Sequence, residues 1–191
     1  MLFSSVILGL AATVSAVDIR FYSNNQGACY SGPWIGCPNA NPNFCCTATG
    51  QFYATVGIVA VPGDWTLTAN GYRGAGCESW QQAAIGRGRD FCLGATGYSM
   101  SGAFYWFGDG RKRSTDQKCE GTEKATQLGL EDGSVYDISD LSDNDVEEMV
   151  RPDLELSLPR TVLANKTYVA LANDGTATED LPHLTPLRRV K

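Results

Sequence analysis

Residues 54–69, ATVGIVAVPGDWTLTA, carry the clearest structural signal in the chain. They begin with a β-branched, apolar run from Ala54 to Val61, which is typical of a buried strand. Pro62-Gly63 then marks a turn, and the run from Asp64 to Ala69 alternates polar and apolar residues, as a half-buried strand does. This stretch therefore predicts two β-strands around a turn.

Similar runs lie on both sides of this stretch. Asp18 to Tyr22 begins with alternation, Ala103 to Phe107 is a dense aromatic strand, and glycine-rich turns such as Asn70-Gly71 separate the runs. One segment, Cys77 to Ile85, is a short helix candidate. Short strands with glycine-rich turns and no long helix predict a mostly β fold, a small antiparallel β sandwich or barrel.

The composition changes sharply near residue 113. Residues 17–113 contain seven basic and five acidic residues, a net charge of +2. Residues 114–191 contain eight basic and sixteen acidic residues, a net charge of −8, and the two segments together give the −6 of the whole chain. We therefore expect a cysteine-rich aromatic β domain at 17–113 and an acidic C-terminal segment at 114–191, of mixed α/β or partly disordered structure.

The acidic segment still contains local structural signals. Gln127 to Ile138 predicts a hairpin that turns at Asp132-Gly133. Ser142 to Val150 has an N-cap residue, acids in its first turn and a proline soon after, which predicts a short helix. Thr161 to Leu171 is a candidate for one more strand.

Residues 1–16, MLFSSVILGLAATVSA, predict a cleavable signal peptide. An uncharged apolar run from Val6 to Val14 is followed by the small residues Ser15 and Ala16, where signal peptidase cuts. We therefore expect a secreted, extracellular chain that begins at Val17. A membrane span needs about 20 apolar residues, and no stretch approaches that length, so no span is expected.

The cysteines agree with export, because disulfides form in oxidising compartments. Adjacent Cys45 and Cys46 cannot comfortably bond to each other, so they should tie two different segments to one point. A metal site is the weaker interpretation, because no C-x-x-C pair is present. The chain has seven cysteines, an odd number, so one thiol is free, pairs between chains, or leaves with a processed fragment. The candidates for disulfide bonding are Cys29, Cys37, Cys45, Cys46, Cys77, Cys92 and Cys119.

Three further positions are candidates for modification. Asn165-Lys166-Thr167 is a glycosylation sequon. Lys112-Arg113 and Arg188-Arg189 are dibasic pairs, so a processing protease of an exported chain could cut after Arg113 and after Arg189. The alternative at residues 111–113 is a charged turn that is never cut, with Cys119 holding the acidic segment onto the domain.

Two segments resemble the Greek-key signature of the βγ-crystallins, in which an aromatic residue is followed by a glycine that lets the hairpin fold over. They are Ile19 to Tyr30 and Trp65 to Cys77, with a weaker echo from Gly97 to Tyr105. The short leader, the adjacent cysteines and the dibasic pairs also resemble fungal secreted cysteine-rich proteins of the effector type. The resemblance implies a crystallin-like or killer-toxin-like β sandwich, without the calcium motif of the βγ-crystallins.

Candidates for catalysis are few. The one histidine, His183, has the character of an ordinary surface residue. Glu78 and Asp90 could face each other across a stapled loop as the paired carboxylates of a glycosidase, or they could be solvated acids that balance Arg87 and Arg89. No phosphate loop, nucleic-acid-binding patch or zinc ligand set is evident, so we expect no cofactor, no metal and no nucleic acid.

The sequence thus favours a secreted, non-enzymatic protein that acts by binding, effector- or toxin-like toward a host or a competing organism. The expected partner is an extracellular protein or glycan, and the chain is expected to be a monomer unless the odd cysteine pairs between chains. The expected contact residues are Trp34, in an exposed loop from Tyr30 to Phe44, together with Arg87 and Arg89. The competing classes are a small carbohydrate-active or antimicrobial enzyme that uses Glu78 and Asp90, and a structural cell-wall-associated protein.

Overall fold

A computed structural model gives the fold of this chain. It describes residues 17–23, 29–49, 53–74, 76–94, 97, 99–108, 118–131, 133–144 and 146. This part of the chain contains eleven strands, which are β1 (Val17–Tyr22), β2 (Trp34–Ala40), β3 (Phe44–Thr47), β4 (Thr55–Val59), β5 (Thr66–Arg73), β6 (Ser79–Arg87), β7 (Phe91–Gly94), β8 (Gly102–Phe107), β9 (Gly121–Lys124), β10 (Gln127–Gly129) and β11 (Val135–Asp137). Among these residues no helix is long and apolar enough to cross a membrane.

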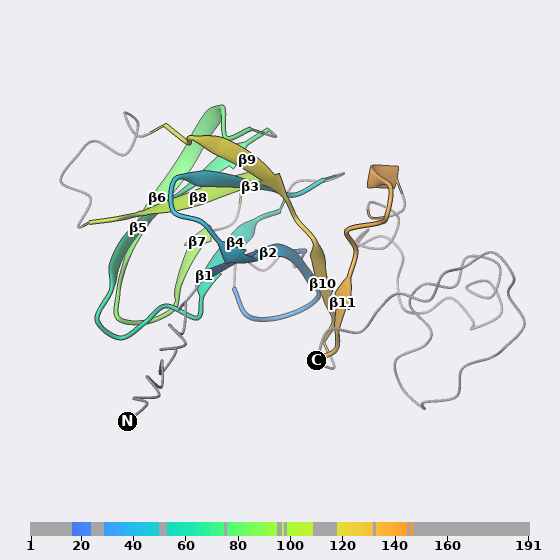
Figure 1. Ribbon diagram of the computed structural model, residues 1–191, viewed down its shortest axis with the longest axis horizontal. Coiled ribbons are helices and arrows are strands. Elements are labelled where there is room, and N and C mark those ends of the chain that lie inside the picture. Colours follow the sequence, from blue (N-terminus) through green and yellow to red (C-terminus); the bar gives the residue numbers. More distant parts are fainter. Residues whose placement is uncertain are drawn as a thin grey trace, which may run out of the picture.

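The strands form two layers that pack face to face (Figure 1). One sheet has six strands in the order β11-β10-β2-β1-β4-β7, and the other has five in the order β6-β5-β8-β3-β9. Neighbouring strands are antiparallel except for β3 and β9, which run parallel. The prediction of a mostly β, disulfide-stapled antiparallel sandwich is therefore confirmed.

Strands β1–β4 and β5–β8 are arranged as two equivalent units. In the first unit β2, β1 and β4 lie side by side, and β3 crosses to the other sheet, where it pairs with β8. In the second unit β6, β5 and β8 lie side by side, and β7 crosses back to pair with β4. The third strand of each unit therefore pairs within the sheet formed by the other unit, and this exchange connects the two units.

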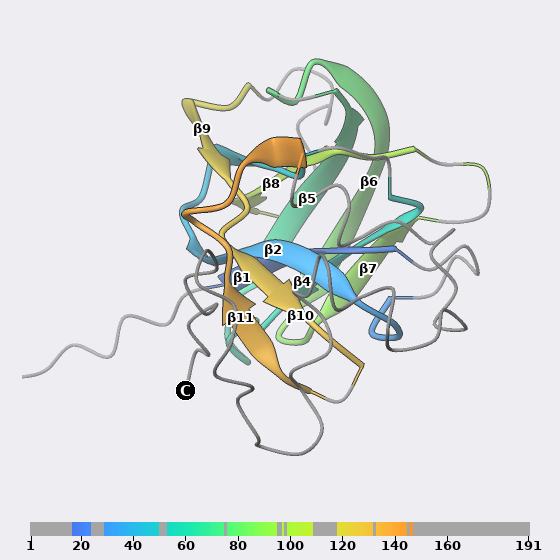
Figure 2. The same cartoon turned by 90° about the vertical axis from the view of Figure 1, so that its right-hand side faces the viewer.

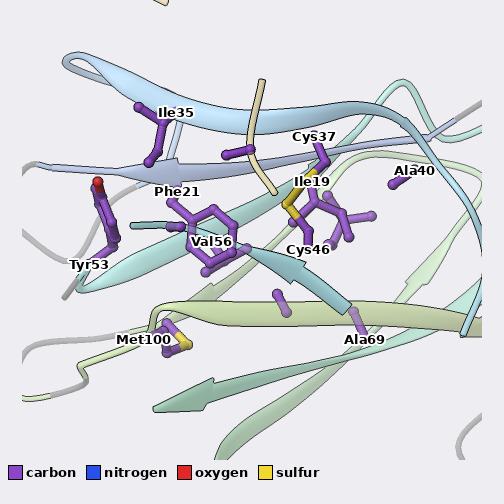
Figure 3. Packing of buried hydrophobic residues seen from close by; sticks show 14 of the residues in the cluster. Ile19, Phe21, Ile35, Cys37, Ala40, Cys46, Tyr53, Val56, Ala69 and Met100 are labelled. Carbon is purple, nitrogen blue, oxygen red and sulfur yellow. A yellow bond between two sulfur atoms is a disulfide. The ribbon is translucent and has the colours of Figure 1, made fainter. Parts of the chain in front are cut away.

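The core lies between the sheets and is built by alternation along the strands. Ile19 and Phe21 of β1 and Val56 of β4 point inward from one sheet, toward Ala69 of β5 in the other sheet and toward Met100, which precedes β8 (Figure 3). These side chains are almost fully buried. Since successive side chains of a strand point to opposite faces, the intervening residues of β1 lie on the outer surface.

Three disulfides staple the sandwich, with sequence separations of 9, 32 and 63 residues. Cys37 of β2 bonds to Cys46 of β3 across the core, as Figure 3 shows, while Cys45 bonds to Cys77, so the adjacent cysteines do tie different segments to one point. Cys29 bonds to Cys92 of β7. The seventh cysteine, Cys119, has a free, partly buried thiol.

The acidic segment contributes strands to both sheets. β9 pairs with β3 and β10 pairs with β2, so the chain passes from one sheet to the other between them (Figure 2). Ala125, Leu128 and Ile138 belong to the same core as β1 and β4. The described part of the acidic segment is therefore integral to the sandwich, despite its charge.

Local predictions had mixed outcomes. The hairpin around Asp132-Gly133 is present as β10 and β11, and the Val146 N–H donates to the Ser142 carbonyl as in a helical turn. The helix predicted from Cys77 to Ile85 is wrong, because this segment is mostly β6, paired with β5 along its length. Its glutamines and alanines tolerate either structure, and the pairing decides. The expected strand from Thr161 to Leu171 lies outside the described residues.

Candidate functional site

The two carboxylates considered for catalysis do not form a pair. Glu78 immediately precedes β6 and Asp90 lies three residues after its last residue, so the nine-residue strand separates them. At about 3.3 Å per residue, that strand spans roughly 25–30 Å. Paired carboxylates of a glycosidase lie about 5–10 Å apart. The suggestion that these residues face each other across a stapled loop is therefore wrong.

The three predicted contact residues lie in different settings. Arg87 and Arg89 are exposed around the tight turn between β6 and β7, as expected for a surface loop. Trp34 is the first residue of β2 and only 8% exposed, so the prediction of an exposed loop from Tyr30 to Phe44 is wrong. The remaining predicted positions, Arg113, Asn165, His183 and Arg189, lie outside the described residues.

Trp34 is instead part of an ordered group on the outer face of the six-stranded sheet. The guanidinium carbon of Arg20 lies 4.2 Å from the centroid of the Trp34 ring. An Arg20 nitrogen lies 2.9 Å from a carboxylate oxygen of Asp18, so one cation contacts both an aromatic ring and an acid. The indole lies against Gly129 of β10, where an added Cβ would come within 2.1 Å of the ring.

A pair of tyrosines continues this group across the sheet. Tyr22 and Tyr30 meet edge to face with ring centroids 6.0 Å apart, and both rings lie over Gly57 of β4. Tyr22 is buried, whereas Tyr30 is 53% exposed. Tyr30 follows Cys29, whose disulfide to Cys92 fixes its position above β7.

The backbone of Tyr30 is strained in a way that presents its ring. Its φ of 70° lies in the left-handed region, which is uncommon for a residue other than glycine, asparagine or aspartate. Such strain persists only where the surroundings enforce it. We call the surface made by Asp18, Arg20, Tyr22, Tyr30 and Trp34 the Tyr30 face.

Both phenols of the Tyr30 face stay protonated at physiological pH. Burial raises the pKa of Tyr30 to about 12, and the nearby Asp90 carboxylate and Tyr22 act in the same direction. Burial also raises the pKa of Tyr22, although the Arg20 guanidinium opposes this shift by its charge and a hydrogen bond. The two tyrosines therefore act as neutral hydroxyls that can donate or accept hydrogen bonds.

The Tyr30 face combines aromatic, cationic and acidic groups. It offers an exposed ring, a guanidinium and a carboxylate in fixed positions, and its residues contain no histidine or thiol to act as base or nucleophile. Nowhere in the described part of the chain do three or more His, Cys, Asp or Glu side chains gather in a way that could hold a metal ion.

Sequence reasoning missed most of this surface, although one signal was available. The alternation of Asp18 to Tyr22 places Asp18, Arg20 and Tyr22 on the side opposite the core residues of β1. The roles of Tyr30 and Trp34 depend on strand pairing and on the Cys29–Cys92 bond, which the sequence does not specify.

Comparison with known proteins shows a family relationship. Residues 18–127 match a family model described as an N-terminal domain, and this match covers more than half of the chain. It runs from the second residue of β1 to the first residue of β10 and so includes the whole Tyr30 face. The chain matches no curated protein and no solved structure.

Proposed function

This chain belongs to the ARB_05566_N family of N-terminal domains, and we propose that its domain is a secreted binding module that acts without catalysis through the Tyr30 face. The observation that carries the proposal is the half-exposed ring of Tyr30, held at a positive φ beside a disulfide and against Tyr22. A large side chain fixed in this way loses little conformational entropy on binding.

Tyrosine and arginine are among the residues that contribute most to the binding energy of protein interfaces, and Tyr30 and Arg20 supply both on the Tyr30 face. The neighbouring Asp18 carboxylate adds a group that can select a partner by charge.

We infer an extracellular protein, rather than a glycan, as the partner. A sugar ring stacks on the open face of an aromatic side chain. The Trp34 ring is covered by Arg20, and Tyr22 is buried against Tyr30, which leaves a single exposed ring on the Tyr30 face. One ring beside a charged pair is a better match for a hot spot at a protein interface.

An oxidising, extracellular setting is part of the same proposal. Three disulfides in a sandwich of this size are typical of secreted proteins, and the signal peptide predicted at residues 1–16 supports the same route. An effector- or toxin-like role toward a host or competing organism follows from the resemblance of the sequence to such proteins.

We further propose that the two four-strand units form a βγ-crystallin-like pair of Greek keys. The support is topological, because the two segments with the aromatic–glycine pattern coincide with β1 and β5, the first strand of each unit. A shared origin of the units would explain why each lends its third strand to the other.

The experiment measures saturable binding of the labelled, full-length secreted chain to a panel of plant, animal and microbial cells. For a panel member that binds, Tyr30→Ala should weaken binding by roughly tenfold or more, as at a hot-spot tyrosine. Phe107→Ala is the matched control, because Phe107 is also 53% exposed but lies on β8 of the other sheet.

Protease treatment of the cells should abolish binding, whereas removal of surface glycans should not. Equal binding by Tyr30→Ala and the original chain would refute the role of the Tyr30 face. Binding that survives protease and is lost with the glycans would refute a protein partner.

A further inference from the structure

Strand β6 forms an edge of the five-stranded sheet and pairs only with β5 among the described strands (Figure 2). It is nine residues long, and between Glu78 and Arg87 it contains neither a charged residue nor a proline. Natural proteins usually protect such edges with charges, prolines or short strands, because an open edge can pair with another chain. Here the edge exposes Trp80 and Ile85, at 44% and 45%.

A bulge places both of these apolar side chains on the same face. Trp80 pairs with Tyr72 and Gln82 pairs with Gly71, so Gln81 is an extra residue in β6. Tyr72 and Thr68, the cross-strand partner of Ile85, lie on the same side of β5. Without the bulge, Trp80 and Ile85 would point to opposite faces, because residues five positions apart on a regular strand lie on opposite sides of the sheet.

We propose that β6 of a second copy of this chain adds to β6 in antiparallel fashion, with a two-fold axis at Ala83. In this register Ala83 faces the partner's Ala83, and Gln82 faces the partner's Ala84. The bulge makes Trp80 and Gln81 together face the partner's Ile85. Beyond it, Glu78 faces the partner's Arg87, and the two-fold axis repeats every pair.

The sequence of β6 is complementary to itself in this register. The exposed acid Glu78 meets a base, the exposed indole of Trp80 meets an aliphatic side chain, and the small Ala83 residues meet at the axis. Opposite charges and aromatic–β-branched pairs both stabilise neighbouring strands. A shift by one residue would place outer-face side chains opposite core-facing ones, such as Ala84.

The dimer would join two five-stranded sheets into one continuous sheet. It is distinct from a disulfide dimer through Cys119, and it replaces the expectation of a monomer. β6 belongs to the sheet opposite the Tyr30 face, so dimerisation would leave both copies of that face available. Two linked copies bind a surface with several targets more tightly than one.

The test is the molar mass of the full-length secreted chain, measured by sedimentation equilibrium over a series of concentrations. The original chain should show a monomer–dimer equilibrium that is unchanged by dithiothreitol at a concentration that leaves the protein folded. Ile85→Lys should be monomeric. Glu78→Arg and Arg87→Glu should each weaken dimerisation by roughly tenfold, because each creates two like-charge pairs.

The double variant Glu78→Arg/Arg87→Glu should restore the dimer, since it reverses each pair without changing its attraction. Arg89→Glu is the matched control, with the same change of charge two residues beyond β6. As a second test, Ala83→Cys should form a disulfide-linked dimer in air, whereas Ala84→Cys should not, because Ala84 packs toward the core.

A purely monomeric original chain would overturn the proposal. So would a dimer that Ile85→Lys leaves intact, or single charge reversals that the double variant fails to rescue. Far-ultraviolet circular dichroism of each variant separates loss of the dimer from loss of the fold.

Discussion

Arg20 covers the ring of Trp34, with its guanidinium carbon 4.2 Å from the ring centroid, while the same guanidinium binds Asp18 at 2.9 Å. Replacement of Arg20 by alanine would expose the indole and leave the acid without its cation. We expect Arg20→Ala to lower the free energy of unfolding by about 1–2 kcal/mol. Urea denaturation measures this, with Arg20→Lys as a control that keeps the charge. A lysine variant as stable as the original chain would contradict the planar stacking role, since lysine keeps the charge but lacks the planar group.

Gly129 makes room for the Trp34 indole, because an added Cβ would lie 2.1 Å from the ring. We expect Gly129→Ala to push the ring off β10 and lower the free energy of unfolding by about 1–3 kcal/mol. Gly63→Ala is the matched control, since nothing lies within 4 Å of a Cβ there. The control should change stability by less than about 0.5 kcal/mol. Equal effects at the two glycines would contradict the packing argument.

We expect removal of two of the disulfides to have similar effects on stability but different effects on binding. Removal of Cys29–Cys92 and of Cys45–Cys77 by paired replacement with alanine should each cost about 3–4 kcal/mol of stability, because both close long loops. Only the first removal should also weaken binding through the Tyr30 face, since Cys29 precedes Tyr30. Thermal melting and the cell-binding assay distinguish the two. Equal loss of binding in both variants would point to general destabilisation.

Glu123 should make the fold sensitive to pH. Burial raises the pKa of its carboxyl, and its Oε1 atom has no hydrogen-bond partner among the described residues. A carboxyl whose pKa is raised by folding contributes full stability at pH values below the pKa that it has in the unfolded chain. This contribution is lost as the pH rises through the pKa that the carboxyl has in the folded chain. Glu123→Gln should therefore raise the melting temperature at neutral pH.

The gain from Glu123→Gln should disappear below about pH 4, where the carboxyl is protonated in both states. The exposed Glu131→Gln serves as the control and should change little at either pH. A gain that is the same at pH 3 and pH 7 would show that the carboxyl charge is not the cause.

Cleavage after Arg113 should not release the acidic segment. β9 and β10 pair with β3 and β2, and Leu128 and Ile138 lie in the core. Cys119 has a free thiol, and all three disulfides join cysteines before residue 113. A chain cut there should elute as one species under native conditions and separate into two on a non-reducing denaturing gel. Native separation of the fragments would contradict the integral role of β9 and β10.

The strands of the first half could be read from the sequence because their apolar residues alternate at a period of two. That period reports which side of a strand meets the core, as in β1, where Ile19 and Phe21 are buried. The period-two pattern failed for β6, because its residues show no clear alternation. This segment is a strand because it pairs with β5. The same pattern failed for β2, in which Pro38 and Asn39 resemble a loop.

The sequence by itself determined a β protein with paired cysteines, because side-chain alternation, turn residues and cysteine content are local properties. Only the tertiary structure decided which cysteines pair, and it placed the acidic β9 and β10 inside the sandwich. It alone brought Tyr30 onto Tyr22 and Arg20 onto Trp34. These contacts join residues from different strands and loops, and their geometry depends on strand register, which no local pattern specifies.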